Sequence, residues 1–399
     1  MNRPPLEVAD IVHQYGAAFL ARYGATLSRE QHRALRAIAL CRTAALGGHK
    51  AQCDQCGHEE LSYNSCRNRH CPKCHGAAQA AWLAAREREV LDVPYVHVVF
   101  TLPHTLSALS LHNPRVLYGM LFRTVAQTLQ DIAGDPKHLG ADIGGLAVLH
   151  TWGQQLHHHP HLHCVLPAGG LAPEGTRWIS CRPHFFLPVK VLSRRFRRVF
   201  LDALEQAARR GALTLTGRCQ DLAVPHAWQR FLGALRRTEW IVYAKEPLRT
   251  PQQVLKYLAR SPHRVAISNQ RLLTLENGQG TLRYKAYQRG PRPRPLDAVE
   301  FLRRFLLHML PRGFQRLRHF GFLANRVRQS KLTQCRTLVR QPAGVPPALR
   351  VEAQAPPGQE ARGLGCPACQ RGQLAWVETL PPQPAVYARE TPPAGWDTS

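Results

Sequence analysis

The segment QQLHHHPHLHC (residues 154–164) contains five histidines within seven consecutive positions, a density that points to metal binding or proton transfer. Its second half, HLHCVLP, predicts a β-strand, and a strand turns alternate side chains to opposite faces. His161 and His163 therefore share one face, whereas Leu162 and Cys164 take the other face and anchor the strand in a core. Two imidazoles two residues apart on one face can chelate a divalent ion.

A third ligand is expected from a neighbouring strand. If LAVLHTW (146–152) pairs antiparallel with the histidine strand, Gln154 comes close to His161 and His163. Two imidazoles and one amide oxygen leave coordination positions open, as catalytic sites do. The alternative is a solvent-facing or structural pair, because an isolated His-x-His is weak evidence. The run 157–159 is expected in the turn before the strand, with a solvated, DNA-facing or incidental role.

A covalent nucleophile fits the chemistry better than a two-metal nuclease, because acidic residues are sparse in the central part of the chain. TPQQVLKYLARSPHR (250–264) predicts a capped helix that ends at Pro262, with Tyr257 in its middle and Ser261 one turn later. A tyrosine hydroxyl that attacks a phosphodiester gives a 5′-phosphotyrosine and a free 3′-OH. The alternative is that Tyr257 is an ordinary packing residue.

Half of the twelve cysteines lie between Cys41 and Cys74. Two CxxC pairs in this region are separated by 14 residues, a spacing that predicts one structural zinc ion held by four thiolates, those of Cys53, Cys56, Cys71 and Cys74. A second zinc ion is an alternative for the further ligands nearby, which are Cys41, Cys66, His58, His70 and His75. This metal-type spacing indicates a reducing cytoplasm rather than a disulfide framework.

Basic residues accompany both predicted sites. Arg67, Arg69 and Lys73 stand on the cysteine knuckle and suit contacts with phosphate. The stretches RRFRRVF (194–200) and LRYKAYQRGPRPR (282–294), the second with Arg283 and Lys285, are expected to follow a DNA backbone and stack bases, or else to form an ordinary solvated helix and edge strand.

The whole chain of 399 residues carries 53 Lys and Arg against 26 Asp and Glu, a formal net charge of +27. Such a surplus favours a polyanionic partner, with a basic protein that has no nucleic-acid role as the alternative. No secretory signal and no apolar run long enough for a membrane span are visible, so we expect a cytoplasmic protein, associated with the nucleoid when it is bound to DNA.

Mixed strands and helices without a regular βαβ repeat predict an α+β fold. Strands are expected at 95–102, 146–152, 161–167 and 280–287, and helices at 114–130, 191–209 and 298–310. Four regions follow: a helical zinc-binding domain (1–92), a sheet domain (93–290), a basic extension (291–340) and a Pro-, Ala- and Gly-rich tail (341–399) expected to be disordered. The tail contains one isolated CxxC pair, Cys366 and Cys369, expected to be an unpaired remnant or a separate knuckle.

Several ordered motifs resemble the rolling-circle insertion-sequence transposases of the IS91 type. They span about residues 35–340 and include YNSCRNRHCPKC, PYVHVVFTLPH, LHTWGQQLHHHPHLHCVLPAGG, YLARSPHRVAISN and LPRGFQRLRHFGFLAN. The resemblance implies a zinc-binding region followed by an HUH (His-hydrophobic-His) nuclease domain with a ferredoxin-like palm and a central antiparallel sheet. It implies an enzyme that nicks and transfers single-stranded DNA at element ends, with Mg²⁺ or Mn²⁺ at the histidines and Zn²⁺ in the N-terminal domain.

Residue by residue, the resemblance assigns His161 and His163 to the HUH pair, Tyr257 to the nucleophile and Gln154 to the third ligand. Ser261 stands where two-tyrosine members have a second tyrosine, so the chain resembles single-tyrosine variants such as the common-region elements. The partners implied are single-stranded DNA at element ends and target DNA, with a homo-oligomer left open. Alternatives are a rolling-circle replication initiator, a non-catalytic zinc-dependent DNA-binding protein and a zinc hydrolase.

Overall fold

The computed structural model describes residues 4–74, 82, 86–87, 89–182, 186–248, 253–254, 266–286, 290–340 and 364–384. Contacts divide the chain into two compact units, which are described separately below. The first contains residues 1–74 together with 350–399, and the second contains residues 75–349. The expected boundary at residue 92 therefore differs from the observed one, and the C-terminal segment belongs with the N-terminal unit.

Two helices form the apolar part of the first unit. Helix α1 (Val8–Tyr23) packs on α2 (Arg29–Leu40) and buries Ile11, Phe19 and Ile38 almost completely. A capping box at Ser28 begins α2, because the Ser28 hydroxyl accepts from the Gln31 backbone and the Gln31 side chain accepts from the Ser28 backbone.

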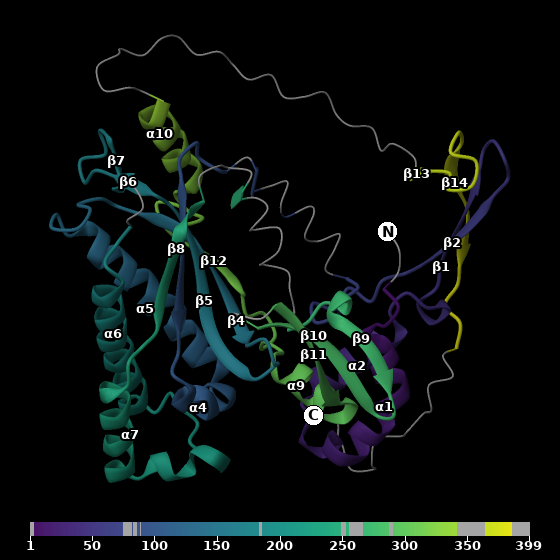
Figure 1. Ribbon diagram of the computed structural model, residues 1–399, viewed down its shortest axis with the longest axis horizontal. Helices are drawn as coiled ribbons and strands as arrows, with labels where there is room; N and C mark the ends of the chain where they lie inside the picture. The colour runs from purple at the N-terminus through teal and green to yellow at the C-terminus, as the bar shows by residue number, and fades with distance from the viewer. Residues whose placement is uncertain are drawn as a thin grey trace. The chain divides into compact units, whose positions relative to one another are not determined.

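A four-stranded sheet with the order β13-β14-β1-β2 completes the first unit (Figure 1). Its strands are β1 (Gly48–Cys53), β2 (Glu59–Tyr63), β13 (Leu364–Gly365) and β14 (Gln373–Leu380). The pairing of β14 with β1 is antiparallel over the whole length of β1. The expectation of a disordered tail is therefore wrong for residues 364–384; residues 341–363 and 385–399 lie outside the described part.

The second unit is organised around a five-stranded antiparallel sheet with the order β12-β4-β5-β3-β8. The strands are β3 (Tyr95–Thr101), β4 (Gly144–Trp152), β5 (His158–Pro167), β8 (Val242–Leu248) and β12 (Leu317–Gly321). With the helices described next, this sheet confirms the predicted α+β class and the central antiparallel arrangement. Every sequence-predicted strand is present, with bounds shifted by a few residues.

Helices cover one face of this sheet (Figure 1). They are α4 (Ser107–His112), α5 (Pro114–Gly134), α6 (Val189–Arg209) and α7 (Pro225–Arg237). The core on this side takes alternate residues of the central strands, among them Phe100, Leu149 and Leu162, all fully buried. The opposite face carries the histidines and a smaller apolar cluster.

The remaining elements of the second unit correct one expectation. Strand β11 (Gly290–Asp297) is the third strand of a meander with β9 (Leu272–Glu276) and β10 (Gln279–Ala286). The segment 291–340, expected as a separate extension, contains α9 (Ala298–Leu307), α10 (Arg328–Arg340) and β12, and β12 is an edge strand of the central sheet. A small ribbon pairs β6 (Gly169–Leu171) with β7 (Trp178–Ser180).

Within the described residues, none of the helices combines the length and the apolar character that crossing a membrane requires.

Candidate functional site

Three histidines converge on one point of the central sheet. One ring nitrogen each of His150, His161 and His163 lies within 4.8 Å of the others. The centroids of the His150 and His163 rings are 4.3 Å apart, and those of His161 and His163 are 4.9 Å apart. This is a three-imidazole cluster on strands β4 and β5.

Strand register explains the convergence. In the β4–β5 hairpin, His150 is directly opposite His161, and Val148 is opposite His163. Facing residues on neighbouring antiparallel strands place their side chains on the same face, so His150 joins the pair. Gln154, expected as the third ligand, lies in the loop beyond the end of β4, where its carbonyl oxygen accepts a hydrogen bond from Arg271 at 2.8 Å. The geometry therefore adds His150 to the two predicted histidine ligands, while a role of the Gln154 amide as third ligand stays a prediction.

The ring orientations of the HxH pair are set by hydrogen bonds. The His161 Nδ1 donates to the His159 carbonyl at 2.7 Å, which leaves Nε2 as the nitrogen able to bind a metal. His97 on β3 lies behind His163, with Nε2 2.8 Å from the His163 Nδ1 and the two rings stacked. Burial lowers the pKa of His161 to about 4, so the ring is neutral and able to act as a ligand at neutral pH.

His158 has a structural role that the sequence did not predict. It begins β5 instead of lying in a turn, and it is buried. The Ser107 hydroxyl lies 2.7 Å from its Nδ1, and the Tyr118 hydroxyl lies 2.8 Å from its Nε2. Burial lowers the pKa of His158 to about 3. The expectation of a solvated or DNA-facing role is wrong for this histidine, which fastens the start of β5 to the helical layer.

The donor set indicates which ions the three histidines suit. Imidazole nitrogens bind transition metals well, whereas Mg²⁺ requires a nearly octahedral set of oxygens. In the described part of the chain the histidine cluster contains no carboxylate. Of the two ions expected, Mn²⁺ therefore fits these residues better than Mg²⁺.

The expected nucleophile, Tyr257, and its neighbour Ser261 lie outside the described residues. Val254, three positions before Tyr257 in the sequence, is fully buried among Tyr95, Leu146 and Val165. These three residues lie on the same face of the sheet as the histidines. Tyr95 is opposite Pro167 and Leu146 is opposite Val165, and both of these β5 residues point to the same side as His161 and His163.

The cysteines of the first unit form two clusters instead of one. Cys53 and Cys56 do not meet Cys71 and Cys74, so the predicted four-cysteine site is not formed. The ligand atoms of each observed cluster lie within 4.8 Å of one another; the clusters are Cys41, Cys66, Cys71 and Cys74, and Cys53, Cys56, Cys366 and Cys369.

The geometry of the first cluster fits zinc. The Cys74 Sγ lies 3.5 Å from the Sγ atoms of Cys41 and Cys66. A tetrahedral zinc site with Zn–S bonds of about 2.3 Å separates its sulfurs by about 3.8 Å, while a disulfide would bring two of them to about 2 Å. Both Cys41 and Cys66 flank the α2–β1–β2 region, so an ion here would fasten helix to sheet.

The basic residues expected on the cysteine knuckle have different environments. Arg67 and Arg69 are exposed, in agreement with a phosphate-binding role. Lys73 is mostly buried and forms a 2.7 Å ion pair with Glu7, so its ammonium group supports the fold instead of facing a partner. In the second unit, Arg283 is exposed on β10; the side chain of Lys285 lies outside the described part.

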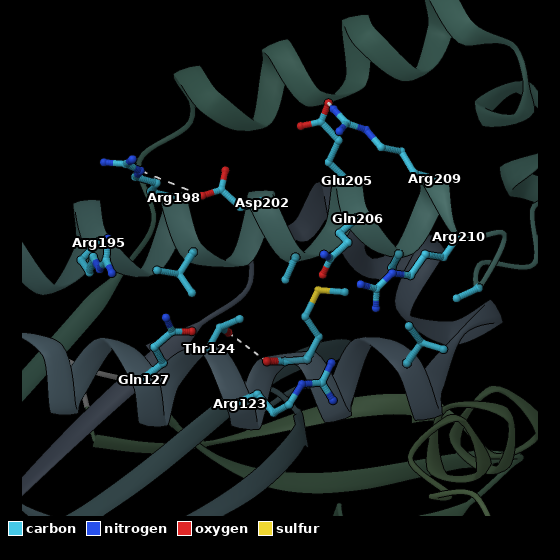
Figure 2. A pocket seen from close by; sticks show the side chains of 16 residues that line it. Arg123, Thr124, Gln127, Arg195, Arg198, Asp202, Glu205, Gln206, Arg209 and Arg210 are labelled. Atoms are coloured by element: carbon cyan, nitrogen blue, oxygen red, sulfur yellow. Dashed lines mark hydrogen bonds and ion pairs between the residues drawn. The ribbon is translucent and has the colours of Figure 1, made fainter.

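A groove of about 820 Å³ lies between α5 and α6 (Figure 2). Five arginines line it: Arg123, Arg195, Arg198, Arg209 and Arg210. Arg195, Arg198 and Arg209 each form an ion pair with a carboxylate, whereas Arg123 and Arg210 form none with a described acidic residue. The RRFRRVF stretch supplies Arg195 and Arg198, so the sequence segment expected to contact phosphates lines this groove.

Comparisons with known proteins agree with these features. The family model described as a putative transposase matches residues 144–331, and the model of the IS91 transposase zinc-binding domain matches residues 11–102. The transposase for insertion sequence element IS801 of Pseudomonas savastanoi is 32% identical over 72% of this chain and 68% of that protein. The putative transposase y4qJ of Sinorhizobium fredii is 50% identical over 100% of both chains. No solved structure matches. A relative that is half identical along its full length, together with both family matches, shows that the chain belongs to the IS91-type transposases, DNA-processing enzymes with an N-terminal zinc-binding domain.

Proposed function

We propose that the chain cleaves single-stranded DNA at an insertion-sequence end and transfers the cut strand to a target in rolling-circle transposition. The observation that carries this proposal is the convergence of His150, His161 and His163 on one face of the central sheet. Membership of the transposase family supports DNA as the partner. Val254, three positions before Tyr257 in the sequence, is fully buried on the same sheet face as the histidines, which supports Tyr257 as the nucleophile. We propose that the protein acts in the bacterial cytoplasm, bound to the nucleoid.

In the proposed reaction the Tyr257 hydroxyl oxygen forms a bond to the scissile phosphorus as it loses its proton. The bond from phosphorus to the 3′ oxygen breaks, and that oxygen takes up a proton to become a free 3′-OH. A divalent ion held by the three imidazoles, Mn²⁺ by preference, would polarise the scissile phosphate. His97 and the His159 carbonyl hold the His163 and His161 rings in place, so that their other nitrogens would face a bound ion.

Transfer then reverses the first step. The oxygen of a 3′-OH forms a bond to the phosphorus of the phosphotyrosine as it loses its proton. The bond from phosphorus to the tyrosine oxygen breaks, and that oxygen takes up a proton, which restores the tyrosine hydroxyl. Ser261 is a poor nucleophile without an activating base, so a single tyrosine must serve both steps within one chain.

The test is covalent capture of labelled single-stranded element ends in Mn²⁺. Wild-type protein should form a denaturation-resistant adduct, and Tyr257→Phe should lose it while retaining DNA binding. Tyr243 is a suitable second variant, because it is exposed on β8 opposite Val99, which is itself opposite His163. Tyr63→Phe in the zinc-binding unit serves as the unrelated control.

The outcomes separate the alternatives. If the adduct is lost in Tyr243→Phe and kept in Tyr257→Phe, the nucleophile is Tyr243 on β8. A wild-type protein that binds DNA and forms no adduct would be a non-catalytic DNA-binding protein. Hydrolysis that survives Tyr257→Phe would indicate a metal hydrolase.

A further inference from the structure

We propose that Cys53, Cys56, Cys366 and Cys369 bind a second zinc ion, which fastens the C-terminal segment to the N-terminal unit. The proposal is independent of the nicking reaction. The family match to a zinc-binding domain ends at residue 102, so two of these four ligands lie far outside the matched region.

The sulfur positions support a tetrahedral ion. The Sγ atoms of Cys53 and Cys369 are 3.7 Å apart, and those of Cys56 and Cys366 are also 3.7 Å apart. These separations agree with the roughly 3.8 Å expected between thiolates on one zinc ion with Zn–S bonds of about 2.3 Å. They are far too long for disulfides, whose sulfurs are about 2 Å apart.

The two CxxC turns have matching backbone geometry. Gly57 donates to the Cys53 carbonyl and Gln370 donates to the Cys366 carbonyl, each four residues after the first cysteine of its pair. Both residues have positive φ, 71° for Gly57 and 58° for Gln370. Two equivalent turns, one from each end of the chain, therefore present their sulfurs to one point, as paired zinc knuckles do.

Gly372 shows how closely the two turns approach. A Cβ at this position would lie 2.4 Å from the Cys53 Sγ and 2.5 Å from Asp54 Oδ1. No side chain fits there, so the second turn can reach the first only with glycine at 372. The Asp54 side chain accepts from the Gln373 backbone at 2.9 Å, which adds a direct link between the segments.

The sheet that these turns terminate cannot be stable through apolar burial. All five residues of β2 are exposed, and β14 has no buried residue; Trp376 and Val377 are 70% and 57% exposed. A small sheet without an apolar core needs another source of stability, and in proteins a structural metal commonly supplies it. The proposed ion lies at the end of the sheet where β1 and β14 meet their turns.

The experiment is zinc analysis of the full chain after exhaustive dialysis. Wild-type protein should hold two zinc ions, and Cys366→Ser/Cys369→Ser should hold one. The matched control, Cys181→Ser/Cys219→Ser, removes two cysteines outside both clusters and should keep two ions. In Co²⁺-substituted protein, the thiolate-to-metal charge-transfer absorption should fall by about half in the first variant only.

A second measurement guards against general misfolding. Hydrogen exchange in Cys366→Ser/Cys369→Ser should accelerate in β1 and β14, while α1, α2 and the central sheet stay protected. Four results would overturn the proposal: one zinc ion in the wild type, two ions in the Cys366→Ser/Cys369→Ser variant, unchanged exchange of β14, or a disulfide between Cys53 and Cys369 found in the purified protein.

Discussion

At the scale of single residues, the candidate site is a set of imidazoles whose protonation is fixed by their neighbours. The His159 carbonyl defines which nitrogen of His161 carries the proton, and His97 occupies Nδ1 of His163. Outer partners of this kind typically change metal affinity by about 10- to 100-fold when removed. The third imidazole of the cluster, His150, comes from the neighbouring strand and is itself buried.

Replacing His150 tests the ligand set. His150→Ala should lower Mn²⁺ affinity by at least about 10- to 100-fold, because a ligand contributes no less than its outer partners. Gln154→Ala should leave the affinity close to the wild-type value, since Gln154 lies beyond the end of β4. Titration of Mn²⁺ followed by electron paramagnetic resonance measures both. A larger loss of Mn²⁺ affinity for Gln154→Ala than for His150→Ala would support Gln154 as the third ligand, as predicted from the sequence.

At the scale of elements, the β4–β5 hairpin positions the site, and His158 holds its second strand in place. The histidine accepts or donates hydrogen bonds on both ring nitrogens, to Ser107 and Tyr118, while burial keeps it neutral. A neutral buried histidine links the stability of the fold to pH, because its imidazole binds a proton in the unfolded chain at pH values at which the buried ring stays neutral.

The pH dependence of unfolding tests this role. The pKa of His158 is about 3 in the fold against about 6.5 in the unfolded chain, so its contribution is complete above pH 6.5 and is lost as the pH falls below it. Each such histidine adds a slope of up to about 1.4 kcal/mol per pH unit. Between pH 7 and 5, the melting temperature of His158→Asn should fall less steeply than that of the wild type. His226→Asn, at an exposed position of α7, is the control; equal slopes in all three proteins would contradict the assignment.

At the scale of the whole molecule, the net charge of +27 suits a partner that is a polyanion along its length. The arginine groove between α5 and α6 is a place where this charge is concentrated, and Arg123 and Arg210 lie there without a described acidic partner. Guanidinium groups of this kind replace counterions on a DNA backbone, so their contribution appears in the salt dependence of binding.

Binding of single-stranded DNA at several salt concentrations tests the groove. Arg123→Ala/Arg210→Ala should weaken binding and reduce the slope of log affinity against log salt by about 1.4, since each phosphate contact to a single strand contributes about 0.7. Arg230→Ala, at an exposed position on α7 that does not line the groove, should leave the slope nearly unchanged. A slope that is equal in the double variant and the wild type would exclude the groove as a phosphate-binding surface.

The sequence predicted the elements well where alternation or helical periodicity was strong, as in the strand around His161 and the helices α5 and α6. Partners across strands were harder to identify, because the register of a hairpin depends on the loop and on bulges. Counting back from His161 through a short loop would have reached His150, and the shift between His150 and Trp152 is such a bulge.

The cysteine pairing could not be predicted from spacing alone. Two CxxC pairs 14 residues apart are a good zinc pattern, yet Cys53 and Cys56 lie with two cysteines from the other end of the chain. Local spacing identifies a knuckle and does not identify its partner, which is a long-range contact. Composition misled in the same region: the Pro-rich surroundings indicated disorder, whereas residues 373–380 form a strand.

The clustering of Cys56 with Cys366 has a consequence for synthesis of the protein. The two residues are separated by 310 positions, and ribosomes add about 5 to 20 residues per second, so the first knuckle waits roughly 15 to 60 s for its counterpart to be made. During this interval its thiols are free and β1 lacks one neighbour, while the whole second unit is translated. Closure of the first unit therefore follows translation of the second unit, and a chain that stops before residue 366 never reaches it.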